Sequence, residues 1–68
     1  MRVFKLTRTS PSGDKEARTV VSPSGVIEFL LGYCSDLELM EALDLCEYGD
    51  EDSVMERETF TLKIQEEE

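Results

Sequence analysis

Carboxylates recur at every third position between residues 38 and 47, and three further acids follow at 50–52. Side chains three or four residues apart on a helix lie about 5–6 Å apart between Cβ atoms, a spacing comparable to that of charges along a nucleic-acid strand. A rigid row of such groups would anchor Lys or Arg side chains of a partner protein. The candidate partner-binding residues are Glu38, Glu41, Asp44, Glu47, Asp50, Glu51 and Asp52.

These acids have few basic neighbours. Sixteen Asp and Glu face seven Lys and Arg, which gives a formal net charge of −9, and no basic residue occurs between Arg18 and Arg57. Like charges at helical spacing destabilise a helix, and a helix selected only for solubility usually interleaves Glu with Lys. That cost suggests a use for the row. The alternative is a solvated face that keeps a small domain soluble and needs no partner.

The remaining reactive residues form no catalytic pattern. The chain has no His, which is the commonest acid–base group, and a catalytic carboxylate needs a pocket that a domain of 68 residues rarely encloses. Cys34 and Cys46 lie in the most acidic stretch, which disfavours the thiolate. The four glycines match no phosphate-binding loop. We therefore expect no enzymatic activity and no cofactor.

A metal site is not expected either. Two cysteines twelve residues apart cannot complete a zinc site without His or further Cys. The acids at 50–52 with Glu56 offer oxygen ligands, but their spacing differs from that of a calcium-binding loop. We expect both thiols to be buried and reduced, with a Cys34–Cys46 disulfide as the minor alternative.

The distribution of charge restricts the partners. Residues 1–20 carry five basic and two acidic side chains, whereas residues 21–68 carry two basic and fourteen acidic ones. The N-terminal bases, with Phe4 as a stacking ring, could contact nucleic acid, but the net charge opposes association with phosphate. We expect no direct binding to nucleic acid or membrane. Because the chain shows neither a signal peptide nor an apolar run of transmembrane length, we expect a cytoplasmic protein.

Periodicity and turn residues predict the elements that position the acids. Alternation over 2–10, turn chemistry over 11–15 and β-branched residues within 16–22 predict a β-hairpin. Ser22 and Pro23 can begin a short apolar helix that Gly32 ends, although a strand fits residues 26–31 nearly as well. Alternation over 54–65 predicts one more strand, with Phe60, Leu62 and Ile64 on one side.

The helix expected over 36–48 has the clearest signal. Ser35 and Glu38 form a capping box, and Gly49 ends the segment. Four residues at helical spacing are expected on its buried face, and three acids on the other. The buried set is Leu39, Met40, Leu43 and Cys46, and the acids are Glu38, Glu41 and Asp44.

The order β-β-α-α-β predicts an α+β domain over 1–65, with a disordered acidic tail over 66–68. Its expected architecture is a three-stranded, mostly antiparallel sheet with two short helices on one face. The last strand would pair beside the first, which would bring the basic N-terminal strand against Glu56 and Glu58.

In size and charge, over the whole chain but through no motif, the protein resembles phage and mobile-element proteins that inhibit host enzymes, including anti-CRISPR proteins and DNA mimics. That resemblance implies a small inhibitor that occupies the basic nucleic-acid-binding surface of a partner, in the host cytoplasm if a phage encodes it. The alternative is an assembly protein that forms a homodimer or a subunit contact. It would use a strand edge or an apolar patch of Phe29, Leu37, Leu45 and Tyr48.

Crowding of like charges over 36–58 leads to a first prediction. Added NaCl should raise the melting temperature of the isolated protein, because salt screens repulsion between exposed acids and the Debye length is near 8 Å at about 0.15 M. Circular dichroism melts across a salt series measure this. A melting temperature that stays flat or falls would show that the acids are already paired or far apart.

Overall fold

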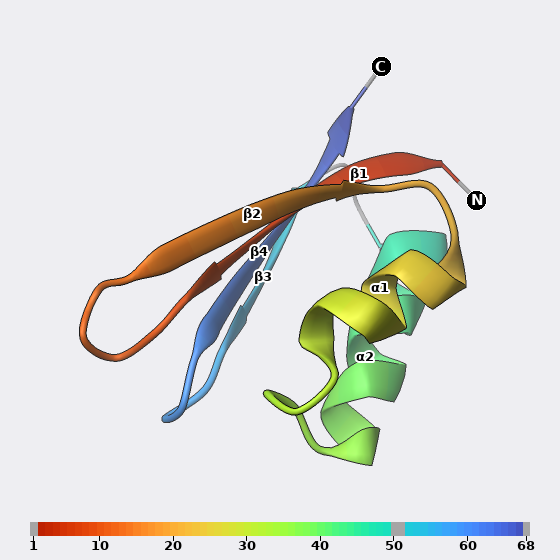
Figure 1. Ribbon diagram of the computed structural model, residues 1–68. Helices are drawn as coiled ribbons and strands as arrows, with labels where there is room; N and C mark the ends of the chain where they lie inside the picture. Colours follow the sequence, from red (N-terminus) through yellow and green to blue (C-terminus); the bar gives the residue numbers. More distant parts are fainter. Residues whose placement is uncertain (1, 50–51, 68) are drawn as a thin grey trace.

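The computed structural model describes residues 2–49 and 52–67, which form one antiparallel sheet and two helices (Figure 1). Along the sheet the strands lie in the order β2-β1-β4-β3. The first and last strands of the chain are therefore neighbours, as predicted. The elements are β1 (Val3–Thr9), β2 (Lys15–Val20), α1 (Pro23–Leu30), α2 (Asp36–Tyr48), β3 (Asp52–Glu56) and β4 (Thr61–Glu67).

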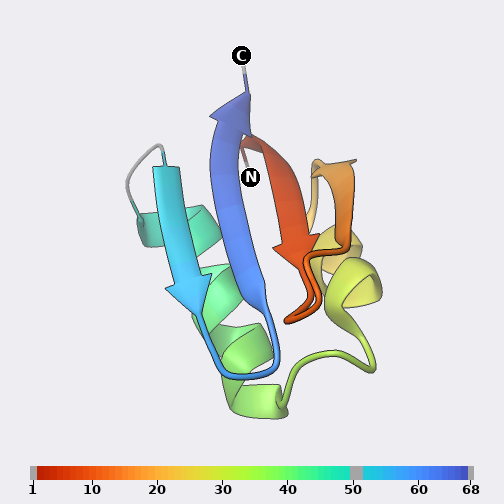
Figure 2. The ribbon, with the colours of Figure 1, turned by 90° about the vertical axis from the view of Figure 1, so that its left-hand side faces the viewer.

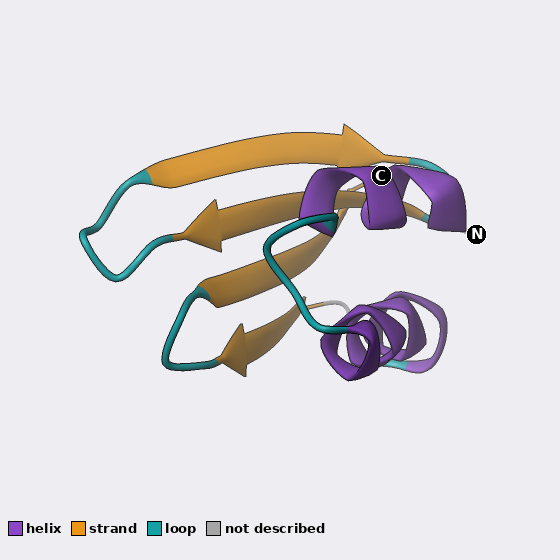
Figure 3. Cartoon of the chain, turned by 60° about the horizontal axis from the view of Figure 1, so that its bottom comes forward, coloured by secondary structure: helices purple, strands orange, loops and turns teal. Residues whose placement is uncertain are grey.

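Both helices cover the same face of the sheet, as predicted (Figures 1 and 3). Figure 2 shows α1 behind the β1–β2 side and α2 behind the β3–β4 side. The core fills the space between the two layers. Its sheet half comes mainly from alternate residues along the central strands β1 and β4, including the predicted inward-facing set, and each edge strand adds one residue. The core residues of the sheet are Phe4, Leu6, Val20, Met55, Phe60, Leu62 and Ile64.

The β1–β2 hairpin forms as its turn residues predicted. Pro11 and Ser12 occupy the centre of a turn closed by a hydrogen bond from the Gly13 amide to the Ser10 carbonyl, at 2.9 Å. Gly13 has a φ of +96°, a left-handed conformation that glycine adopts without steric cost because it has no Cβ. A turn of this kind followed by a left-handed residue is a common three-residue hairpin loop.

The sheet has four strands and not the expected three. The alternating run over 54–65 is broken into β3 and β4 by a tight turn, in which the Arg57 amide donates to the Phe60 carbonyl at 2.9 Å. The loop residues Glu58 and Thr59 carry no Gly, Asn, Asp or Pro signal. Among the described residues, positive φ occurs only at Gly13 and Gly32. The turn is therefore not of type I′ or II′, the hairpin turns that Gly, Asn or Asp residues make recognisable in a sequence.

The helices begin and end where their caps predicted. Ser22 caps α1 with Pro23 in the first turn, and Gly32, with a φ of +86°, follows its last residues. Ser35 and Glu38 form the predicted capping box of α2. Gly49 ends α2 for a different reason than expected. Its φ is −80°, but a Cβ there would lie 2.5 Å from the Leu45 carbonyl oxygen.

The buried face of α2 differs from prediction at one position. Leu39 and Leu43 are half-buried and Cys46 is buried, as expected, but Met40 is exposed and Ala42 takes its place in the core. At about 100° per residue, position 42 lies about 40° from position 46 around the helix, whereas position 40 lies about 120° from it. Ala42 is buried because of this angle, although its side chain is small and only weakly hydrophobic.

Charges across the sheet pair differently from the expectation. The acids at 56 and 58 do not face β1, because β4 lies between β1 and β3. The acid that forms an ion pair with the N-terminal segment is instead Glu66, whose Oε1 lies 2.9 Å from Nη1 of Arg2. Residues 66 and 67, expected in a disordered tail, thus continue β4 and pair with Phe4 and Val3. Residue 68 lies outside the described residues.

Lysines and arginines take different places in the fold. Lys5, Lys15 and Lys63 are exposed on the face of the sheet that the helices leave open, as strand alternation requires. The arginines contact the rest of the protein. Arg2 also donates from Nη2 to the Cys46 and Gly49 carbonyls, at 3.3 and 3.4 Å, where it satisfies the C-terminus of α2.

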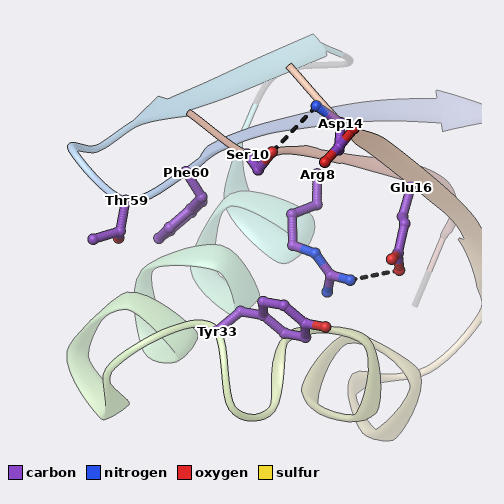
Figure 4. A pocket seen from close by; sticks show the side chains of 7 residues that line it. All are labelled: Arg8, Ser10, Asp14, Glu16, Tyr33, Thr59 and Phe60. Carbon is purple, nitrogen blue, oxygen red and sulfur yellow. Dashed lines mark hydrogen bonds and ion pairs between the residues drawn. The ribbon is translucent and has the colours of Figure 1, made fainter. Parts of the chain in front are cut away.

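Among residues 2–49 and 52–67, Arg8 is the one charged residue in the core, and it is 7% exposed. It follows Phe4 and Leu6 on the inward face of β1. Its guanidinium donates to the Phe29 carbonyl of α1. It also donates, at 2.6 Å, to Glu16 Oε2 (Figure 4). It also stacks on two rings, 3.6 Å from the centroid of Tyr33 and 4.5 Å from that of Phe29. These contacts tie the sheet to α1 and to the segment between the helices.

Truncation of Arg8 should destabilise the protein strongly. We expect Arg8→Ala to lower the free energy of unfolding by about 2 kcal/mol or more, because it removes charge-assisted hydrogen bonds and leaves the buried Phe29 carbonyl without its donor. Lys5→Ala, at an exposed position on the open face of the same strand, is the matched control, with an expected loss below about 0.5 kcal/mol. Urea unfolding measures both. Equal losses in the two variants would show that burial of Arg8 does not stabilise the fold.

Candidate functional site

The predicted acidic row winds around α2 and does not run straight along it. At about 100° per residue, each third position falls about 60° behind the last, so Glu38 and Glu47 lie on opposite sides of the helix. The half-buried Glu38 lies at the side of the helix, next to Arg57, whereas Glu41, Asp44 and Glu47 are exposed. The structure therefore brings three of the four helical acids together on the outward side of α2.

Arg57 of the β3–β4 turn compensates two acids of the row. Its Nε lies 3.7 Å from Glu38 Oε2, and its Nη2 contacts Glu41 Oε2. No such partner is within reach of Asp44 or Glu47 among residues 2–49 and 52–67. Of the four predicted acids on α2, the two without an ion-pair partner thus lie in its C-terminal half, where the helix dipole is also negative.

The acids after α2 take different positions. Asp52 lies on β3, where it alternates with the inward-facing Ser53 and Met55 and so points to the open face of the sheet. It does not share a face with Asp44 and Glu47. Asp50 and Glu51 lie outside the described residues, so the structure does not place them relative to the other predicted site residues.

Glu38 acts within the fold. The Ser35 amide donates to Glu38 Oε1 at 2.9 Å, and the Glu38 amide donates to Ser35 Oγ at 3.3 Å. The first of these hydrogen bonds is the main reason that the pKa of Glu38 is lowered, and Arg57 adds to the effect. This carboxylate fixes the start of α2 and orients the helix that carries the exposed acids.

Three large apolar side chains share the outward side of α2 with the acids. Leu37 is 78% exposed, Met40 62% and Tyr48 82%. Positions 37, 40, 44 and 48 succeed one another at three- and four-residue steps, so they form one stripe, with Asp44 in its middle. Glu41 and Glu47 flank that stripe. We call these six residues the α2 outer face.

Of these apolar residues, the sequence pointed to Leu37 and Tyr48 as components of an apolar patch, together with Phe29 and Leu45. The structure divides that set. Phe29 is buried in the core and Leu45 packs against it, which leaves only Leu37 and Tyr48 exposed. Met40 was missed because it was assigned to the core. Its angle on the helix, relative to Ala42 and Cys46, was the signal that would have placed it outward.

The hollow beside Arg8 is a second feature that sequence reasoning did not anticipate. It has a volume of about 210 Å³, and Tyr33 forms one of its walls (Figure 4). The Arg8 guanidinium in it is already held by Glu16, by the Phe29 carbonyl and by stacking on Tyr33. The other residues that line the hollow are Ser10, Asp14, Thr59 and Phe60. Its charged groups serve the packing of the sheet against the helices.

Both cysteines are free thiols. Cys46 is buried, and burial raises its pKa from 9.0 to about 11, so the thiolate is scarce at neutral pH. The half-buried Cys34 also has a raised pKa, first because of its burial and then because of Glu38 nearby. Neither thiol has the environment of a reactive nucleophile.

Within residues 2–49 and 52–67, no three His, Cys, Asp or Glu side chains come close enough to hold a metal ion. In the same residues, neither helix has the length and apolar character needed to cross a bilayer. Comparisons with protein-family models, with curated proteins and with solved structures give no match.

The capping role of Glu38 gives a prediction about pH. Because its pKa is lowered in the folded state, Glu38 contributes stability above the ordinary carboxyl pKa, and this is lost as pH falls through the folded value. We expect Glu38→Gln, which keeps a capping amide, to lose stability at pH 7 but little at pH 3. Urea midpoints at the two pH values measure this.

Glu47→Gln is the matched control, since it removes the same charge from an exposed position on the same helix. Because Glu47 is not part of the capping box, Glu47→Gln should not show a loss of stability at pH 7 that disappears at pH 3. Identical pH dependence in Glu38→Gln and Glu47→Gln would show that general charge repulsion, and not the capping box, determines how stability changes at acidic pH.

Proposed function

We propose that the protein is a small acidic binding protein without enzymatic activity, and that the α2 outer face occupies the basic nucleic-acid-binding surface of a partner protein and blocks it. Its carboxylates would bind the Arg and Lys side chains that otherwise contact phosphate. An inhibitor of the kind found in phages and mobile elements, of the anti-CRISPR or DNA-mimic type, fits this proposal. It would act in the cytoplasm, or in the host cytoplasm if a phage encodes it.

The exposure of Asp44 and Glu47 on a helix without a single basic residue is the observation that carries the proposal. Acids kept only for solubility are usually interleaved with Lys, and here the lysines lie on the opposite, open face of the sheet. The protein is therefore electrically asymmetric. Such a field steers the α2 side toward positively charged surfaces and away from phosphate.

Competition with nucleic acid tests the proposal. The immobilised chain would be incubated at 0.05 M NaCl with a nuclease-treated lysate of the source organism or, for a phage protein, of its host. Bound proteins would then be eluted with a short DNA duplex. We expect a nucleic-acid-binding protein in the eluate, and we expect the free chain to inhibit its binding to DNA. If the duplex elutes nothing, or if the eluted protein still binds DNA in the presence of the chain, the proposal is wrong.

A pair of charge-matched variants locates the contact. Asp44→Asn/Glu47→Gln should weaken binding to the eluted protein at least about tenfold, since each buried charge-assisted contact is worth more than about 1 kcal/mol. Glu56→Gln/Glu58→Gln on the β3–β4 hairpin removes the same charge from another region and should have little effect. Equal weakening by both would mean that only net charge matters.

The alternative function is structural: a homodimer or accessory subunit that uses a strand edge. β2 favours this candidate, because it is an edge strand of six residues without Pro and with its outer side unpaired in the sheet. Salt separates the two functions. An edge-to-edge or apolar dimer persists in 0.5 M NaCl by sedimentation, whereas the electrostatic complex dissociates.

A further inference from the structure

The stripe of Leu37, Met40 and Tyr48 sets a requirement on the partner that charge alone does not. Each of these side chains is more than half exposed, although α2 has its other side in the core. A chain with so small a core gains stability by burying large apolar residues, so three exposed ones at helical spacing are costly unless something covers them. Their arrangement in one stripe gives a covering element a continuous strip to contact.

Charge identifies the kind of element that would cover the stripe. A second copy of the same face is unsuitable, because it would bring Glu41, Asp44 and Glu47 against their own equivalents, with no basic residue on either helix. A purely apolar surface is also unsuitable, because Asp44 lies within the stripe and would be buried without a partner. The cover must therefore be apolar along its middle and basic along its edges.

A helix is the element that meets this description with the fewest assumptions. The stripe from Leu37 to Tyr48 spans twelve residues, or about 16 Å of helix axis. A partner helix of about three turns can lay an apolar row of its own along that length. Lys and Arg at its flanking positions then reach the carboxylates on either side, as in paired amphipathic helices.

Asp44 would fix how the two helices align. A carboxylate in the middle of an apolar contact needs an opposing Arg or Lys, and only one register supplies it. Leu37 and Met40 would pack on the partner's apolar row toward one end, and Tyr48 toward the other. The Tyr48 ring offers contact area together with a hydroxyl for the rim.

We propose, as a refinement that rests on the proposed function, that the α2 outer face binds a basic amphipathic helix of the partner. Leu37, Met40 and Tyr48 supply the apolar contact, and Asp44 and Glu47, which have no ion-pair partner among the described residues, supply the ion pairs. This names the partner's chemistry more narrowly than a basic surface does. The apolar contact adds affinity, while the carboxylates set the preference for Lys and Arg.

Two synthetic helical peptides test the inference with the full chain. One carries a Leu row at helical spacing flanked by Arg. The other has Ala at the Leu positions and the same Arg residues, so that charge and helix propensity are retained. Calorimetric titration at about 0.1 M NaCl should show the Leu peptide binding about tenfold or more tightly than the Ala peptide.

Variants of the chain assign that difference to the stripe. Leu37→Ser/Met40→Ser should reduce affinity for the Leu peptide to that for the Ala peptide, and leave affinity for the Ala peptide unchanged. Val21→Ser/Leu31→Ser removes two similarly exposed apolar side chains elsewhere and should leave both affinities unchanged. Circular dichroism would verify that both variants fold.

The outcomes separate the two proposals. Equal binding of the two peptides to the unaltered chain would overturn the amphipathic-helix inference and leave the electrostatic function standing. Failure of either peptide to bind at low salt would overturn the function as well. An equal loss in the control variant would show that exposed apolar area in general, and not the stripe, binds the peptide.

Discussion

The guanidinium of Arg8 joins the two layers of this protein, and the positions of the helices depend on it. It reaches from the central strand β1 to the Phe29 carbonyl at the end of α1 and stacks on Tyr33 in the connection to α2. The hydrophobic effect that buries the core is non-directional, so it does not by itself fix how helices lie on a sheet. Hydrogen bonds and ring stacking from a planar group supply the missing direction. In the chain, α2 begins directly after this anchored connection, at the capping box of Ser35 and Glu38.

The division between arginine and lysine follows from the same need. Arg2 satisfies the end of α2, Arg8 anchors the helix connection and Arg57 neutralises Glu38 and Glu41. Their planar groups donate several hydrogen bonds at once, while the lysines remain hydrated on the open side of the sheet. The positive charges of these three arginines are therefore paired within the fold, and those of the lysines lie on the side of the sheet away from α2. The exposed acids in the second half of α2 keep their charge because the fold leaves no cation near them among the described residues.

The α2 helix thus has two faces with different roles. Its inner side contributes Ala42 and Cys46 to the core, and its outer side combines exposed apolar residues with carboxylates. The proposed function needs both properties of that outer side. Carboxylates alone would attract any polycation, whereas an apolar stripe with Asp44 at its centre selects for an arrangement of charge and apolar surface. Rigidity also contributes, since a helix that is capped at both ends loses little freedom when it binds.

Three features could be predicted from the sequence because local chemistry determines them. They are the first hairpin through Pro11 and Gly13, the capping box of α2, and the alternation that buries Phe60, Leu62 and Ile64. Each depends on residues close together in the chain, so its signal survives without knowledge of the fold. The split into β3 and β4 escaped prediction because Glu58 and Thr59 turn the chain without a left-handed residue, and the outward angle of Met40 was obscured by its hydrophobicity. Burial of Arg8 and the pairing of Arg57 with Glu41 join residues at least sixteen positions apart. Only the packing of helices on the sheet brings such groups together, and it alone decided which acids stay exposed.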